Sequence, residues 1–171
     1  TGDITIEGTL SGGTLTKSGA GSLFLTPPLD TGGSGAIVVN EGTLVPGVRG
    51  GSSVCTDMTI NSGATVRMDP SYISTATNIW QGQIGNTLVI NTGGTLDLND
   101  TGGVNNRCKH ITGTGGLITN SGTGPALLIF ANRDGIATWT WGGNIEDGVN
   151  GGTVALTIAN GGAGGVGQTN V

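Results

Sequence analysis

The chain has 171 residues with a net charge of −5, and 36 of its residues are glycine, roughly three times the average usage. Aromatic residues make up 4% and charged residues 10%, so the chain lacks both the bulky core of an ordinary globular domain and the charge of a disordered one. Its lysines and arginines are scattered singly, which argues against a nucleic-acid partner. No apolar run reaches about 18 residues, so no membrane span is predicted in this segment.

A strand-and-corner pattern opens the chain at residues 1–8, and one corner phrase then returns three times. The copies are Asn40-Glu41-Gly42-Thr43-Leu44, Asn61-Ser62-Gly63-Ala64-Thr65-Val66 and Asn91-Thr92-Gly93-Gly94-Thr95-Leu96. Each copy follows an alternating apolar stretch and leads into another, with a glycine where the backbone needs positive φ. The phrase therefore predicts strand, tight polar corner, strand, with Asn40 and Gly42, Asn61 and Gly63, and Asn91 and Gly93 as structural corner residues.

The spacing of the three corners predicts stacked coils. The asparagines lie 21 and then 30 residues apart, which suits a coil of about 20 to 25 residues with loops of variable length. The longest loop insertion covers residues 69–87. Aligning the copies predicts three inward rows: Ile37, Met58 and Leu88; Val39, Ile60 and Ile90; and Leu44, Val66 and Leu96. The expected fold is a single all-β domain over residues 1–171, a right-handed parallel β-helix (β-solenoid) of about seven or eight coils without long helices.

Residues 13–46 carry a longer motif around the first corner. Lys17, Gly19, Gly21, Leu23 and Leu25 stand at alternate positions, and after a loop comes an apolar strand that closes with Gly42 and Leu44. This arrangement resembles the passenger-associated strand repeat of bacterial autotransporters and related surface proteins. The resemblance implies a right-handed parallel β-helix exposed outside a bacterial cell, where it serves as a stalk that carries or presents something else.

Two cysteines, Cys55 and Cys108, fall in polar or glycine-rich stretches and form the disulfide candidate. Extracellular proteins commonly bridge such a pair. The corner alignment places them two coils apart, about 10 Å, whereas a disulfide needs Cα atoms within about 7 Å, so their loops would have to fold toward each other. Separately buried free thiols are the alternative. With one histidine and no short cysteine spacing, neither a metal site nor a cofactor is expected.

The best candidates for catalysis are one acidic pair and one basic cluster. Parallel β-helices that are polysaccharide lyases or hydrolases need carboxylates for Ca²⁺ or for acid–base work, or a basic residue that removes a proton. Here those residues would be Asp97 with Asp100, or Arg107 with Lys109 and His110. Asp100 belongs to a turn pattern, and the basic residues flank Cys108, so structural or solvated roles are favoured. A non-enzymatic protein is therefore expected, with a polysaccharide lyase or hydrolase as the second alternative.

Aromatic residues offer the first alternative, a carbohydrate-binding module. Trp139 and Trp141 would point to one face of a strand, where indoles can stack on sugar rings, although inward packing is the favoured reading. Tyr72 and Trp80 lie in the 69–87 insertion, which either packs back over a sheet or contacts a glycan or protein partner.

The two ends of the chain bear on partners. Residues 161–171 contain no amphipathic helix that would cap a β-helix, and uncovered strand edges invite pairing. Either the segment belongs to a longer solenoid or its ends meet copies of the same chain, and copies that meet head to tail would build a filament. The expected function is an extracellular structural scaffold or adhesin stalk of a bacterial surface protein that assembles end to end.

Overall fold

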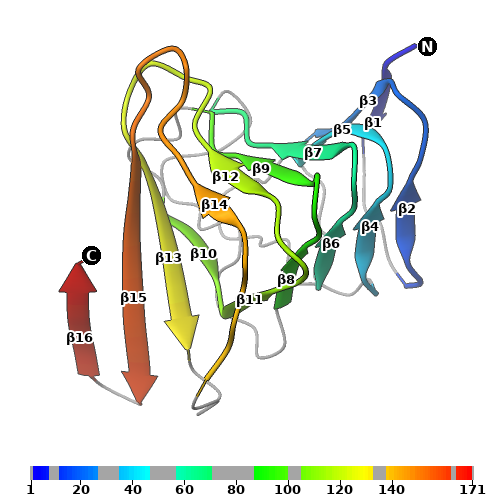
Figure 1. The fold of residues 1–171 in the computed structure, drawn as a ribbon. Coiled ribbons are helices and arrows are strands. Elements are labelled where there is room, and N and C mark those ends of the chain that lie inside the picture. The colour runs from blue at the N-terminus through cyan, green and yellow to red at the C-terminus, as the bar shows by residue number, and fades with distance from the viewer. Residues whose placement is uncertain are drawn as a thin grey trace.

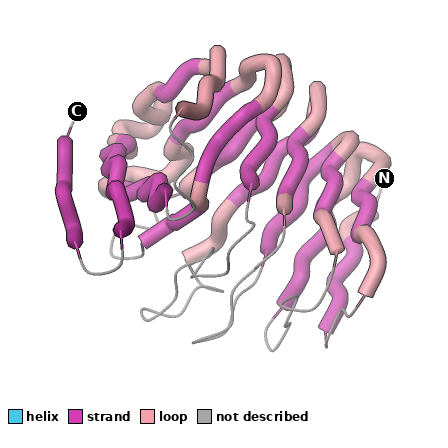
Figure 2. Tube along the Cα trace, turned by 90° about the horizontal axis from the view of Figure 1, so that it is seen from below, coloured by secondary structure: helices cyan, strands magenta, loops and turns pink. Residues whose placement is uncertain are grey.

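The strands in the described part of the chain lie in three sheets. The computed structural model describes residues 2–7, 12–26, 35–46, 57–70, 87–99, 105–132, 138–162 and 165–170. Within these ranges the chain forms strands and turns but no helix (Figure 1, Figure 2). The predicted all-β class is confirmed, and the described ranges hold no helical segment able to cross a membrane.

Two of the sheets contain twelve of the strands between Ile4 and Ile145. The seven-stranded sheet has the order β1 (Ile4–Glu7), β3 (Ser22–Thr26), β5 (Gly42–Pro46), β7 (Ala64–Arg67), β9 (Thr95–Asp97), β12 (Leu117–Thr119) and β14 (Asn144–Ile145). The five-stranded sheet has the order β2 (Leu15–Lys17), β4 (Ile37–Val39), β6 (Met58–Ile60), β8 (Thr87–Ile90) and β11 (His110–Thr112). All neighbouring strands in both sheets pair in parallel.

Short corners explain why successive strands change sheet. The corner between β4 and β5 is two residues long and that between β6 and β7 is three residues long. Such a corner turns the chain away before a strand can pair with the strand just before it. Each strand pairs instead with the equivalent strand of the next pass of the chain around the core, as β4 does with β6 and β5 with β7. That counterpart runs in the same direction, and the sheets are therefore parallel.

The register confirms the three predicted inward rows. Strand pairing places Ile37 beside Met58 and Met58 beside Leu88, and Val39, Ile60 and Ile90 follow in the same way. In the seven-stranded sheet, Leu44 lies beside Val66 and Val66 beside Leu96. Every member of these rows is at most 1% exposed. Apolar residues at alternate positions therefore form the core between the sheets.

One aliphatic row runs through the whole seven-stranded sheet. It contains one residue from each strand: Ile4, Leu23, Leu44, Val66, Leu96, Ile118 and Ile145. Its inner members are buried, whereas Ile4 is 61% and Ile145 39% exposed at the two ends. Each member thus needs a neighbour on both sides to lose its contact with water.

A four-stranded sheet joins the later part of the chain, and the corner repeat did not predict it. It contains β10 (Asn105–Cys108), β13 (Ala126–Asn132), β15 (Val154–Gly162) and β16 (Gly165–Asn170). Its first three strands are parallel, but β16 folds back antiparallel on β15, beside it in Figure 1. A purely parallel arrangement is therefore wrong for the pair of strands β15 and β16. Leu128 and Phe130 of β13 are buried and belong to the same core as the other sheets.

Candidate functional site

The predicted corners form a hydrogen-bonded ladder of asparagine side chains. Asn61 Nδ2 donates to Asn40 Oδ1 at 2.8 Å, and Asn91 Nδ2 donates to Asn61 Oδ1 at 2.8 Å. The corner glycines Gly42, Gly63 and Gly93 have φ of 70°, 78° and 82°. These are left-handed conformations that favour glycine. The corner residues are consequently held in structural contacts, as the repeat predicted.

Lys17 occupies an inward position that apolar residues hold in the other strands. It pairs with Val39 in register and is only 7% exposed. Its Nζ donates hydrogen bonds to the backbone oxygens of Gly19 at 2.5 Å and Glu41 at 2.9 Å. A buried amine needs such partners. The lysine of the repeat motif therefore links two successive corners through hydrogen bonds, a role that the motif alone did not reveal.

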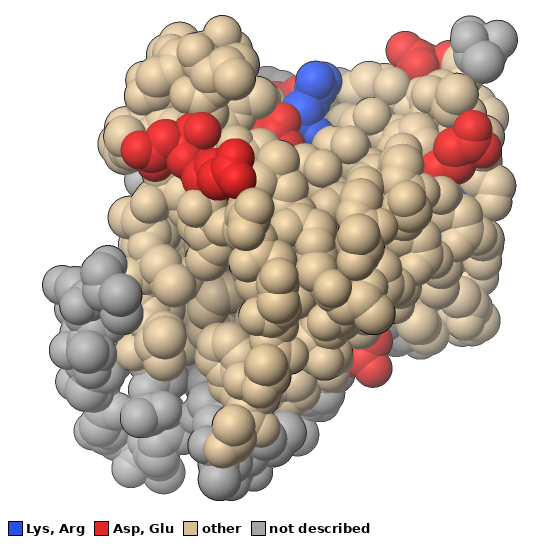
Figure 3. All heavy atoms as spheres, viewed as in Figure 1, with Lys and Arg blue, Asp and Glu red and all other residues tan. Residues whose placement is uncertain are grey.

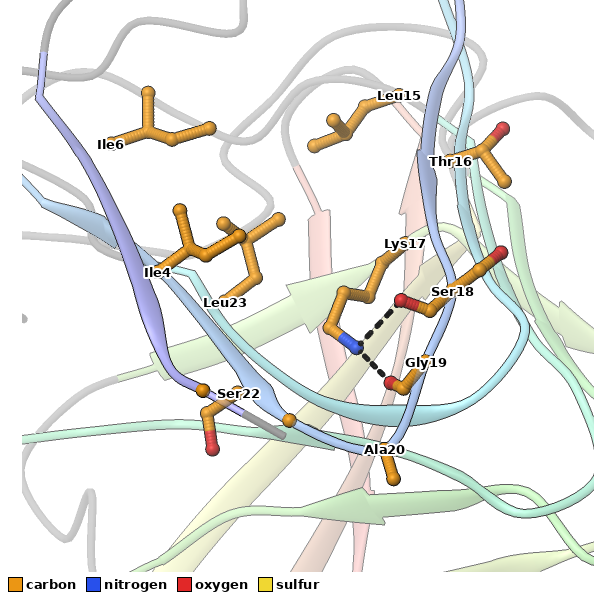
Figure 4. Close-up of a pocket in the computed structure, with 12 residues that line it drawn as sticks. Ile4, Ile6, Leu15, Thr16, Lys17, Ser18, Gly19, Ala20, Ser22 and Leu23 are labelled. Carbon is orange, nitrogen blue, oxygen red and sulfur yellow. Dashed lines mark hydrogen bonds between the residues drawn. The ribbon is translucent and has the colours of Figure 1, made fainter.

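A cavity of about 410 Å³ opens where the seven-stranded sheet continues one strand beyond the five-stranded sheet. The five-stranded sheet ends at β2, while β1 still extends the other sheet. Ile4, Ile6 and Leu15 line the cavity, with Lys17 at one side (Figure 4). The cavity is therefore an opening into the apolar interior, lined by the edge strands β1 and β2.

Both tryptophans of the predicted pair pack against the core. Trp139 and Trp141 are half-buried, and the ring of Trp139 lies 5.1 Å from that of Phe130 between centroids. Trp141 Nε1 donates to the backbone oxygen of Gly115 at 2.8 Å and to that of Ile90 at 3.3 Å. This geometry agrees with the inward packing that the sequence favoured, and it leaves the indole N–H of Trp141 engaged.

Asp97 is held by neighbouring turns. It is 6% exposed, its Oδ1 accepts hydrogen bonds from the backbone N–H groups of Asn99 and Ser121, and its Oδ2 accepts one from Ser121 Oγ at 2.6 Å. Asn99 has a positive φ of 41°, a conformation that non-glycine residues seldom adopt. Asp97 thus stabilises the turn that starts at Leu98, while its predicted acidic partner Asp100 lies outside the described residues.

Of the predicted basic cluster, the structure describes the side chains of Lys109 and His110. Lys109 is 5% exposed, and the half-buried His110 places Nε2 3.1 Å from Thr87 Oγ1. His110 Nδ1 is buried without a hydrogen-bond partner. The backbone of Arg107 belongs to β10, but its side chain lies outside the described part. Among the described residues, no group of three His, Cys, Asp or Glu side chains lies close enough together to hold a metal ion.

Cys108 lies inside the core. It is 2% exposed, and burial raises the pKa of its thiol well above the usual value of 9.0. Cys55 lies outside the described residues, so the Cys55–Cys108 disulfide stays a prediction. Tyr72 and Trp80 also lie outside them, as does most of the predicted insertion, although Thr87 at its end begins β8.

The outer face of the five-stranded sheet was not singled out by sequence reasoning. Between its inward rows stands an outward column of threonine and valine: Thr16, Val38, Thr59, Val89 and Thr112. The signal was present in the aligned strands, because every residue between two inward positions must point outward. It is visible only once all five strands are aligned.

Comparisons of the chain with protein-family models, with curated proteins and with solved structures found no match.

Proposed function

We propose that the chain is a right-handed parallel β-helix of about seven or eight coils that serves as an extracellular scaffold or stalk of a bacterial surface protein. The observation that carries the proposal is the aliphatic row from Ile4 to Ile145, to which every strand of the seven-stranded sheet contributes one residue. Each pass of the chain lengthens such a stack by about 4.8 Å without adding a new kind of contact. Length at constant width is what a stalk requires.

The polar side chains of the described corners support a structural role. The asparagine ladder, Lys17 and Asp97 all bond within or between neighbouring passes. The resemblance of residues 13–46 to the strand repeat of bacterial surface proteins is what supports an extracellular location in this proposal. Antibody labelling of intact cells that produce the protein tests that location, and labelling that requires cell lysis would contradict it.

End-to-end assembly is the specific form of this proposal. Ile4 and Ile145 are the exposed ends of one row, and a second copy placed head to tail would bring Ile145 onto Ile4. The edges of β14 and β1 are both parallel edges of the same sheet, so the contact would continue that sheet from copy to copy. Such a contact does not close on itself and therefore builds a filament.

Negative-stain microscopy of the purified chain tests the assembly. Filaments are expected for the unchanged chain, and short rods are expected for Ile4→Asp and for Ile145→Asp, because either carboxylate would be buried in the contact. Val149→Asp is the matched control, since Val149 is 98% exposed but lies outside the row. Short rods for the unchanged chain at high concentration, or an equal effect of the control, would refute end-to-end assembly.

A further inference from the structure

The outer face of the five-stranded sheet carries a regular two-dimensional array of side chains. Its central column alternates threonine and valine, one residue per strand, from Thr16 to Thr112. The asparagine ladder runs beside it, and Thr114 continues that ladder by donating to Asn91 Oδ1. In Figure 1 the strands β2, β4, β6 and β8 that bear the array lie side by side. We call these two columns the threonine–asparagine array.

The array is ordered before anything binds to it. Parallel strands in unbroken register repeat every ~4.8 Å, and outward residues along one strand repeat every ~6.6 Å. Threonine and valine are β-branched, so few χ1 rotamers are open to them. The hydrogen bonds between Asn40, Asn61 and Asn91 fix the second column. Little side-chain entropy is therefore left to lose on contact with a ligand.

The array is uncharged and contains no aromatic ring. Thr16 and Thr112 are exposed, and the central Val38, Thr59 and Val89 are half-buried but accessible. Three of the described titratable side chains lie beside it. Asp57 is exposed and His110 half-buried, at the starts of strands β6 and β11. Glu41 is exposed after Asn40 and accepts a hydrogen bond from the backbone N–H of Gly19. In Figure 3 the broad middle of the visible face is tan, and acidic side chains appear toward its margins. The threonine, valine and asparagine side chains of the array itself therefore offer no charge to a polyelectrolyte or a mineral surface.

The chemistry of the columns suits ordered water. Threonine hydroxyls and asparagine amides donate and accept hydrogen bonds, while the valine and threonine methyl groups between them offer water no partner. Water over such a surface is held at regular points and kept away between them. Ice is also a periodic arrangement of water molecules, so it can match a layer of water anchored at regular points. A single soluble ligand has no such periodicity.

We propose that the threonine–asparagine array binds the surface of ice through a layer of ordered water. A crystalline polysaccharide is the other periodic ligand, but sugar rings are held in proteins largely by aromatic faces, and the array has none. The inference does not rest on the stalk function or on filament assembly. The array lies on the side of the stacked strands, so contact between the ends would leave it uncovered.

Partition of the purified chain into slowly growing ice tests the proposal, with inhibition of ice recrystallisation as the second measurement. The unchanged chain is expected to enter the ice and to keep crystals small. Thr59→Lys, at the centre of the array, is expected to abolish both effects. Thr65→Lys is the matched control, because Thr65 is also a half-buried, outward-facing threonine in mid-sheet, but on the seven-stranded sheet. It is expected to leave both effects intact.

Circular dichroism and the melting temperature of each variant separate loss of binding from loss of the fold. Thr16→Lys and Thr112→Lys place the same charge at exposed positions of the array, where the fold should tolerate it, and they too should weaken both effects. Exclusion of the unchanged chain from ice overturns the proposal, as does equal loss in Thr65→Lys. Binding to insoluble cellulose or chitin without any effect on ice would also overturn it and assign the array to a polysaccharide.

Discussion

Asn61 donates a side-chain hydrogen bond of 2.8 Å to Asn40, although the two residues lie 21 positions apart in the chain. Asn91 repeats the bond to Asn61 at 2.8 Å across 30 positions. The ladder therefore sets how successive passes stack, whatever the length of the loop between them. Flat parallel sheets over many strands are commonly stabilised by side-chain ladders of this kind.

Replacing Asn61 by alanine removes the middle of the ladder. The change deletes one bond to Asn40 and one to Asn91, so the free energy of unfolding should fall by about 1–2 kcal/mol. Denaturant titration measures the loss. Ser62→Ala, at the exposed neighbouring position, is the control and should change stability little. Equal stability of the two variants would show that the ladder contributes nothing.

Alanine substitutions at two corner glycines distinguish the cost of a strained backbone from the cost of steric crowding. Gly42 and Gly63 both have positive φ, so alanine at either position should cost roughly 1–2 kcal/mol from the left-handed backbone alone. A Cβ at Gly63 would meet nothing within 4 Å, whereas one at Gly42 would lie 2.5 Å from the oxygen of Gly21 and 2.8 Å from Lys17 Nζ. Gly42→Ala should therefore destabilise the protein more than Gly63→Ala does. Thermal unfolding of the two variants, compared side by side, decides this.

Lys17→Met tests the hydrogen bonds by which the buried Lys17 links two corners. Methionine keeps most of the apolar stem but removes the hydrogen bonds to Gly19 and Glu41, which leaves their carbonyl groups without this donor. A loss of about 1–3 kcal/mol is expected, as for hydrogen bonds from a charged group. Thr16→Ala, at an exposed position of the same strand, is the comparison. An unchanged unfolding midpoint for Lys17→Met would mean that these hydrogen bonds do not stabilise the fold.

The two tryptophans should respond differently to replacement by phenylalanine. Trp141 loses its hydrogen bonds to Gly115 and Ile90, whereas Trp139 keeps an aromatic ring against Phe130. Trp141→Phe should therefore be the less stable variant by about 1 kcal/mol. Unfolding curves of the two variants check the order. Tight binding of soluble oligosaccharides that requires both indoles would instead revive the carbohydrate-binding alternative.

Burial of Cys108 predicts a dependence of stability on alkaline pH. Its folded-state pKa lies above the usual value of 9.0, so the folded protein keeps this proton to higher pH than the unfolded chain. The contribution is fully present below the unfolded pKa, and it is lost as pH rises from there toward the folded value. Under reducing conditions, unfolding free energy should fall less steeply above about pH 9 in Cys108→Ala than in the unchanged protein. Parallel slopes would contradict the burial of this thiol.

Alternating residues at aligned corners were enough to predict the strands on either side of the three corners, the three inward rows and the positive φ of the corner glycines. The reason is local: a strand presents every second residue to one side, and a tight corner requires glycine at a fixed place. The inward position of Lys17 was less accessible, because a lysine in a motif does not show that backbone oxygens from two corners surround its amine. The ordinary roles favoured for Asp97 and for the tryptophan pair agree with the contacts found.

The sequence by itself determined the all-β class and the register of the repeated passes, since both follow from patterns a few residues long. Only the tertiary structure decided where the repeat stops. The antiparallel return of β16 on β15, the packing of Trp139 and Trp141, and the cavity at β1 and β2 depend on which strand edge meets which segment. The threonine–asparagine array also depends on the tertiary structure. None of its residues is unusual in the sequence, and they form a regular surface only because five strands stack in register.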